Sequence, residues 1–142
     1  MTGPFRLVIP RPLYEAMLAH ARAELPAECC GLLAGTVADG IGHVTLHLPL
    51  VNALKSPTEY ESEPRSMFAA HKAMRATATD VLAVYHSHPA TDPIPSRRDR
   101  ERNYGEGVIN LIIGLRTAEP QVRGWWLTAE SAREAEWAVD QQ

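Results

Sequence analysis

A short apolar strand that ends in two histidines constrains the fold of this chain more than any other feature. The residues Val81-Leu82-Ala83-Val84-Tyr85 are apolar and partly β-branched, a pattern that predicts a buried central strand. His86-Ser87-His88-Pro89 follows directly. Because residues two apart in an extended chain point to the same side, we expect both imidazoles to enter one space at the carboxyl end of the strand.

Two polar residues follow these histidines at a spacing that indicates a metal site. Seven residues separate His88 from Ser96, and two more separate Ser96 from Asp99. Asp99 can join His86 and His88 in a set of three nitrogen and oxygen ligands, which suits a catalytic zinc ion that keeps its fourth position for water. The simpler alternatives are two hydrogen-bonded histidines and, for Ser96-x-x-Asp99, a capping box at a helix start.

Composition favours a single domain over residues 1–142. With 142 residues, 45% of them hydrophobic, the chain can bury a core of ordinary size. It contains no run of eighteen apolar residues and no signal-peptide pattern, so we expect no membrane association. A net charge of −3 gives no general attraction to nucleic acid.

The two cysteines, Cys29 and Cys30, are adjacent in the sequence. Neighbouring cysteines rarely bridge each other, because the geometry strains the peptide between them. The chain therefore lacks a disulfide framework, which fits a reducing cytoplasm. We expect both thiols to be packing residues rather than metal ligands.

Hydrophobic periodicity, proline and glycine predict a mixed sheet with helices. We predict strands at residues 5–9, 30–35, 43–51, 81–86, 108–115 and 122–128. The tail at 133–139 has a helix-like composition but alternates like a strand, and we predict a strand. Helices are predicted from Pro10 to Pro26, over about 63–77, and briefly from Ser96. The fold class is therefore α/β or α+β, as a sandwich of one mixed sheet and helices.

Three of these elements carry specific expectations about which side chains share a face. In the strand at 43–51, Val44, Leu46 and Leu48 alternate with polar residues and should share one side. In the first helix, an apolar face at roughly 3.6 spacing should be buried, comprising Leu13, Met17, Ala21 and Leu25. Trp125 and Trp126 should lie on opposite faces of their strand, one in the core and one partly exposed.

Hydrolysis at such a metal site also needs a general base. A carboxylate can take a proton from water and deliver it to the leaving amine. Glu28 and Glu59 both flank apolar strands. Composition and spacing alone leave both candidates open.

At this point the sequence resembles the JAMM metalloprotease family, also called the MPN+ or JAB1/MPN domain. The family pattern is a distant glutamate, then His-Ser/Thr-His-Pro, then serine and aspartate at the spacing found here. The resemblance covers about residues 5 to 128 and is closest to small prokaryotic members. It implies a cytidine-deaminase-like JAB/MPN fold. The matching positions are 26–35 (PAECCGLLAG), Asn52, His86-Ser87-His88-Pro89, Ser96 and Asp99.

The resemblance also implies residue roles and a reaction. His86, His88 and Asp99 would hold one zinc ion per chain, Glu28 would be the general acid/base, and Ser96 would steady the developing oxyanion. The reaction would be hydrolysis of a peptide or isopeptide bond at the diglycine tail of a ubiquitin-like or sulfur-carrier protein. Only eight residues separate Asp99 from the strand at 108, which argues against large insertions that grip ubiquitin chains.

The overall function and several side chains have more than one interpretation. A non-catalytic MPN scaffold that binds protein partners is the alternative function, although such relatives usually lack the ligands. The arginines at 97, 98, 100 and 102 form either a solvated helix face or a docking patch for an acidic partner. A partly exposed tryptophan could contact substrate or a second copy in a homodimer. We expect the remaining histidines to be surface or partly buried residues: His20, His43, His47 and His71.

Overall fold

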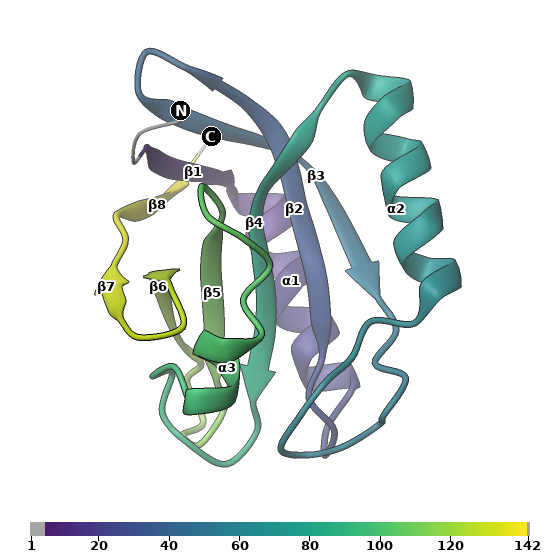
Figure 1. Cartoon of the computed structure of the whole chain (residues 1–142), viewed down its shortest axis with the longest axis vertical. Helices are drawn as coiled ribbons and strands as arrows, with labels where there is room; N and C mark the ends of the chain where they lie inside the picture. Colours follow the sequence, from purple (N-terminus) through teal and green to yellow (C-terminus); the bar gives the residue numbers. More distant parts are fainter. Residues whose placement is uncertain (1–4, 142) are drawn as a thin grey trace.

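A single mixed sheet forms the centre of the molecule, which is a computed structural model whose residues 5–141 are described (Figure 1). Within these residues the sheet has eight strands in the order β7-β6-β5-β4-β2-β3-β1-β8. The strands are β1 (Arg6–Pro10), β2 (Cys30–Ala38), β3 (Ile41–Leu50), β4 (Asp80–His88), β5 (Ile109–Gly114), β6 (Gln121–Leu127), β7 (Ala132–Glu134) and β8 (Trp137–Asp140).

Two long helices cover opposite faces of this sheet. Helix α1 (Arg11–Ala23) buries Met17 and Ala21 in a cluster that includes Tyr85. Helix α2 (Pro64–Thr77) packs in a separate cluster that includes Val84. Since successive strand residues point to opposite faces, the neighbours Val84 and Tyr85 place the two helices on opposite sides. The α+β class with a mixed sheet and flanking helices is confirmed.

Local sequence signals account for the helix ends. Proline occupies the first turn of α1 and of α2, where no backbone N–H is needed. At the start of α2 the Glu63 side chain accepts a hydrogen bond from the Ser66 N–H, 3.0 Å away. Helix α2 matches its predicted span, whereas α1 ends at Ala23, and Leu25 beyond it is 45% exposed. The expectation that Leu25 belongs to the buried face was wrong.

The predicted alternation in β3 was also wrong. In the β2–β3 register Ala34 pairs with Leu46 and Gly35 with Val44, so that Thr45 is an extra, bulged residue. The bulge turns Val44 to the α1 side, while Leu46 and Leu48 contact the α2-side cluster. The tail forms strand structure as predicted, but in two pieces: β7 pairs with β6, and β8 pairs in parallel with β1.

Strand β4 lies between β2 and β5, in the middle of the sheet. It runs antiparallel to β2, with Cys30 opposite His86, and parallel to β5. The residues just before β2 therefore meet the last residues of β4 at the same end of the sheet. The short helix α3 (Arg97–Glu101) lies in front of this end (Figure 1). No helix in the described part of the chain is long and apolar enough to cross a membrane.

Candidate metal centre and its surroundings

Strand β4 and helix α3 bring three polar side chains together at the end of the sheet. His86 and His88 are 1% and 7% exposed, and both imidazoles point to the side opposite Tyr85 and Ser87. Their Nε2 atoms are 3.2 Å apart. Asp99 places Oδ1 3.2 Å from His86 Nε2 and Oδ2 3.1 Å from His88 Nε2. The predicted trio is thus assembled.

The donor set fits a metal ion. His88 Nδ1 lies 2.9 Å from the Asp92 carbonyl oxygen and donates to it. In the neutral imidazole, which is the form that binds a metal, the Nε2 lone pair therefore faces His86 and Asp99, whereas the protonated imidazole donates from Nε2 to Asp99. Zinc bonds of about 2.0–2.1 Å in tetrahedral geometry place neighbouring ligand atoms about 3.3 Å apart, close to the separations found here. Among the described residues, this is the one group of three or more histidine, cysteine or acidic side chains with such proximity.

The two imidazoles also act on the Asp99 carboxyl. Burial alone would raise its pKa, but hydrogen bonds with His86 and His88 hold the pKa of Asp99 well below its usual range. The carboxyl is therefore ionised at neutral pH, as a metal ligand must be.

A capping box at the start of α3 orients Asp99. The Ser96 hydroxyl oxygen accepts the Asp99 N–H at 3.1 Å, and the Ser96 N–H donates to Asp99 Oδ2 at 2.9 Å. The predicted capping box is confirmed. The Ser96 hydroxyl proton has no acceptor in the described part of the chain, so the serine keeps a donor free.

Glu28 lies two residues before β2, and its carboxyl group is close enough to His88 and Asp99 for their charges to act on it. It is 5% exposed, and its carboxylate makes no hydrogen bond or ion pair with the described residues. Burial raises the pKa of Glu28 to about 8; the charge of His88 lowers the pKa and that of Asp99 raises it. A carboxyl group that titrates near neutrality beside a metal centre is suited to proton transfer.

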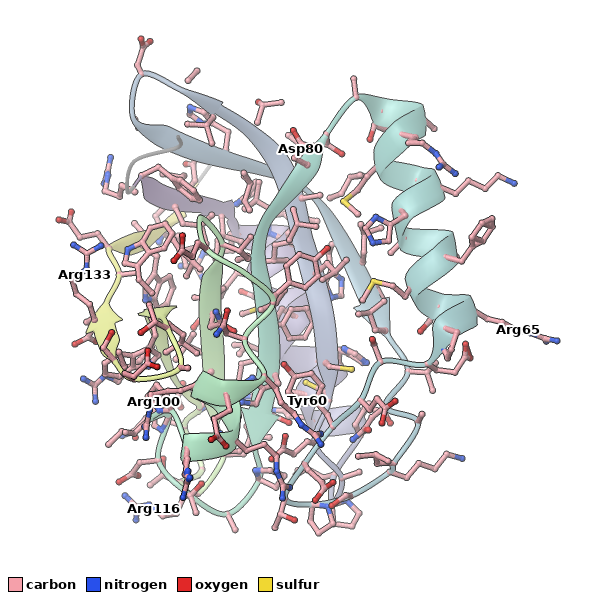
Figure 2. The ribbon with its side chains drawn as sticks, in the orientation of Figure 1. Tyr60, Arg65, Asp80, Arg100, Arg116 and Arg133 are labelled. Carbon is pink, nitrogen blue, oxygen red and sulfur yellow. The ribbon has the colours of Figure 1, made fainter. Side chains whose placement is uncertain are left out.

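The segment at 52–63, which links β3 to α2, forms a second wall of the site. Tyr60 stacks on the His86 imidazole, with ring centroids 4.9 Å apart, and lies beside the end of β4 (Figure 2). Glu59 forms an ion pair with Arg98 of α3. Glu59, the other candidate base, is therefore already engaged by a cation, whereas Glu28 is not.

Asn52 organises this segment with four hydrogen bonds. Its Nδ2 donates to the carbonyl oxygens of Glu28 and Glu59, at 3.0 and 3.1 Å. Its Oδ1 accepts the N–H groups of Leu54 and Glu61. The side chain is 5% exposed, so these bonds satisfy an amide that would otherwise be costly to bury.

A groove of about 420 Å³ runs from Asp99 over the α2 side of β2 and β4. Its floor is apolar, formed by Cys30, Leu32, Leu50, Met67 and Val84. Its rim is charged, formed by Glu59, Glu61, Arg98 and Arg102. Along one wall, Asn52 forms an antiparallel bridge with Ser62. The N–H and C=O groups of Tyr60 and Ser62 point away from that bridge, and we find no partner for them among the described residues.

Residues 10–128 match the protein family described as prokaryotic homologs of the JAB domain. The chain belongs to this family. The resemblance to the JAMM family is therefore confirmed, and the site described above is the polar end of a JAB domain.

Curated relatives of this JAB domain carry the names of peptidases. It is 41% identical over 93 residues to the CysO-cysteine peptidase of Mycobacterium tuberculosis, covering 66% of this chain and 62% of that protein. It is 36% identical over 112 residues to a desampylase of Haloferax volcanii, covering 75% and 79%. A probable TtuB-protein conjugate cleaving protease of Thermus thermophilus is 39% identical over 94 residues, covering 66% and 60%. The chain thus matches about three fifths of the length of two of these relatives.

Solved structures share this fold. A solution structure of a protein from Desulfitobacterium hafniense aligns with a TM-score of 0.86 at 32% identity, covering 96% of this chain and 94% of that one. A second, from Salinibacter ruber, aligns with a TM-score of 0.65 at 26% identity, covering 95% and 90%.

Two features of this JAB domain have no signal in the sequence. One is the stacking of Tyr60 on His86. The other is a His-Tyr-His cluster on the α1 side of the sheet, where the Tyr85 hydroxyl lies 2.6 Å from His20 Nδ1 and 2.7 Å from His47 Nε2. Only the tertiary pairing of α1, β3 and β4 brings these residues together, and no local pattern signals it.

The two cysteines and the two tryptophans lie as the sequence predicts. Cys29 and Cys30 are free and buried, and burial raises the pKa of each thiol to about 12, so both are packing residues. Trp125 is 9% exposed and its Nε1 donates to the Pro93 carbonyl oxygen, while Trp126 is half-buried and packs edge-on against Phe5. The two tryptophans thus differ as expected.

Proposed function

We propose that this protein is a zinc-dependent metallopeptidase or isopeptidase. The observation that carries the proposal is the position of a buried, unpaired Glu28 carboxyl beside the His86, His88 and Asp99 trio. Such a pairing of a metal centre with a free carboxyl group is what hydrolysis of an amide bond requires. The peptidase names of the relatives support the same reading.

Each side chain has one task in this proposal. His86, His88 and Asp99 hold one zinc ion per chain, which supplies a Lewis acid next to the scissile carbonyl. The Glu28 carboxylate accepts a proton from the attacking water and then delivers it to the leaving amine nitrogen. The Ser96 hydroxyl donates a hydrogen bond to the carbonyl oxygen as negative charge develops there.

We propose the diglycine tail of a ubiquitin-like or sulfur-carrier protein as the substrate. The relatives named for CysO-cysteine, TtuB-protein conjugates and desampylation support this class. Strands β2 and β4 have neighbours on both sides, so an extended tail cannot pair with them. It would instead pair with the open main-chain groups of Tyr60 and Ser62, along the groove. We further propose a reducing cytoplasm as the compartment, since both buried thiols are free.

The alternative function is a scaffold that binds partners without hydrolysis. All three candidate ligands, Glu28 and Ser96 are present, which argues against this alternative. A scaffold should also purify without stoichiometric zinc, whereas the peptidase should contain about one ion per chain.

A direct test uses a sulfur-carrier protein that is extended past its diglycine tail. We expect the protein to release the extension, and mass spectrometry should detect cleavage after the second glycine. A chelator should stop the reaction and added zinc should restore it. A carrier whose two glycines are replaced by bulky residues is the matched control. Failure of the zinc-loaded protein to cut any extended carrier would contradict the proposal.

A further inference from the structure

The residue between the two metal-site histidines is tied to the residue that follows Glu28. Ser87 is fully buried, and its side chain points to the α1 side, away from the imidazoles. Its hydroxyl oxygen accepts the Cys29 N–H at 2.8 Å. Its own N–H donates to the Cys29 carbonyl oxygen at 3.3 Å. Two hydrogen bonds therefore join Ser87 and Cys29.

This pair ends the β2–β4 ladder in an unusual way. In a continued antiparallel ladder a hydrogen-bonded pair exchanges two main-chain bonds, so the Cys29 N–H would donate to the Ser87 carbonyl. Here the Ser87 hydroxyl oxygen, instead of the Ser87 carbonyl oxygen, accepts the Cys29 N–H, and strand β2 begins only at Cys30. The chain thus leaves the ladder at Cys29, directly next to Glu28.

The other anchors of Glu28 come from a different part of the molecule. The Glu28 N–H donates to the Ser56 carbonyl at 2.8 Å, and the Glu28 carbonyl accepts from Asn52 Nδ2 at 3.0 Å. Both partners belong to the segment at 52–63. The bonds to Ser87 are therefore the hydrogen bonds nearest to Glu28 that join its chain segment to the strand that carries His86 and His88.

We infer that Ser87 is a positioning residue that fixes the distance between the general base and the metal ligands. The inference rests on the proposed function. The Ser87 side chain faces away from the two imidazoles, and it acts through the Cys29 N–H. A misplacement of about 1 Å can lower a rate by about a hundredfold, so a single buried hydrogen bond at this junction matters for turnover.

The test compares Ser87→Ala, Ser87→Thr and Thr128→Ala on an extended carrier substrate. Thr128 is the matched control, because its hydroxyl accepts the Ser131 N–H at 3.0 Å, beyond the end of β6 that lies away from the metal site. We expect Ser87→Ala to lower kcat about tenfold or more, with KM within about twofold and one zinc ion still bound. Ser87→Thr keeps the hydroxyl and should restore most of kcat, and Thr128→Ala should leave it unchanged.

An unchanged kcat in Ser87→Ala would overturn the inference, and so would loss of zinc or an equal fall of kcat in Thr128→Ala. Amide hydrogen exchange gives a readout that needs no substrate. The Cys29 N–H should be protected in the wild-type protein and should exchange at least about tenfold faster in Ser87→Ala. Rapid exchange at Cys29 in the folded wild type would overturn the inference even if Ser87→Ala did not fold. An inactive wild type with a protected Cys29 amide would instead refute only the proposed function.

Discussion

Glu28 and Asp99 share one site but meet different surroundings. Burial raises the pKa of Glu28 to about 8, because the Glu28 carboxylate has no hydrogen-bond partner among the described residues. Asp99 is partly buried, yet its contacts with His86 and His88 keep its pKa well below the usual range. When environments move two carboxyl groups apart in this way, one can exchange protons at neutral pH while the other stays ionised.

The first prediction concerns Glu28→Gln. The amide has a similar shape but cannot accept a proton from water, so kcat on an extended carrier should fall by about a hundredfold or more. Zinc content, measured by elemental analysis, should remain about one ion per chain. Glu59→Gln is the matched control and should keep kcat within a few-fold. Near-full activity of Glu28→Gln would show that Glu28 is not the base, and Glu59 would then be the candidate.

The second prediction concerns His47 and the pH dependence of stability. Burial lowers the pKa of His47 from 6.5 to about 4 in the folded protein. Between these values the unfolded chain binds a proton that the folded protein excludes, so acidification favours unfolding. The stabilisation is complete above about pH 6.5 and is lost as the pH falls toward 4.

Chemical unfolding of wild type and His47→Gln at several pH values tests this sign. The difference in stability between the two proteins should shrink as the pH falls from 7 to 4, because all other groups titrate in both. His71→Gln, at an exposed position, should show a constant difference from wild type. A constant difference for His47→Gln would show that His47 titrates normally.

At the scale of elements, helix α3 and the segment at 52–63 face each other across the groove. The Arg98–Glu59 ion pair joins them, and both side chains are partly exposed, at 50% and 33%. Such a pair adds little to global stability. The ion pair does hold the segment at 52–63, which carries Tyr60, close to His86 and Asp99. We therefore expect its loss to weaken substrate binding.

The third prediction follows for Arg98→Ala. KM for the carrier should rise several-fold, while kcat and the melting temperature change little, because the reacting groups stay in place. Arg97→Ala is the control on the same helix, since Arg97 pairs with Glu101 of α3 itself and is 83% exposed. Steady-state kinetics of both variants distinguishes the two positions. Equal KM values would mean that the ion pair does not shape the groove.

For the whole molecule, the metal centre should couple to folding. A ligand that binds only the folded protein at a hundredfold excess over Kd adds about 2.7 kcal/mol, or about 5 to 10 °C in Tm for a chain of this size. We therefore expect zinc to raise Tm by that amount in thermal unfolding. His88→Ala should lose both the zinc and the shift, whereas His43→Ala, at an exposed position, should keep them. A shift that persists in His88→Ala would place the ion elsewhere.

The sequence predicted the parts of this molecule that depend on local order. Helix α2, the central strand and the spacing of His86, His88 and Asp99 all carry their signal within a few residues. The bulge at Thr45 carries none, because it arises from how β3 meets β2. Leu25 fits a helical period, but the helix ends before it.

The site could be predicted only in part for the same reason. Residue types and spacing predicted that His86, His88 and Asp99 would lie together, yet they left Glu28 and Glu59 equal as candidate bases. Their difference lies in Arg98, which contacts Glu59 across 39 positions of sequence. Likewise the Tyr60 stack and the Tyr85 cluster depend on which elements become neighbours, which no short pattern contains.

The junction of Cys29 with Ser87 also has a consequence for the order in which the protein becomes active during synthesis. The two residues are 58 positions apart, and Asp99 comes later still. During synthesis, the first strands, α1 and the proposed base Glu28 leave the ribosome before His86, His88 and Asp99 do. Under the proposed function, hydrolytic competence would therefore arise in a single event, when β4 and α3 join β2, and a growing chain would not cleave other proteins before then.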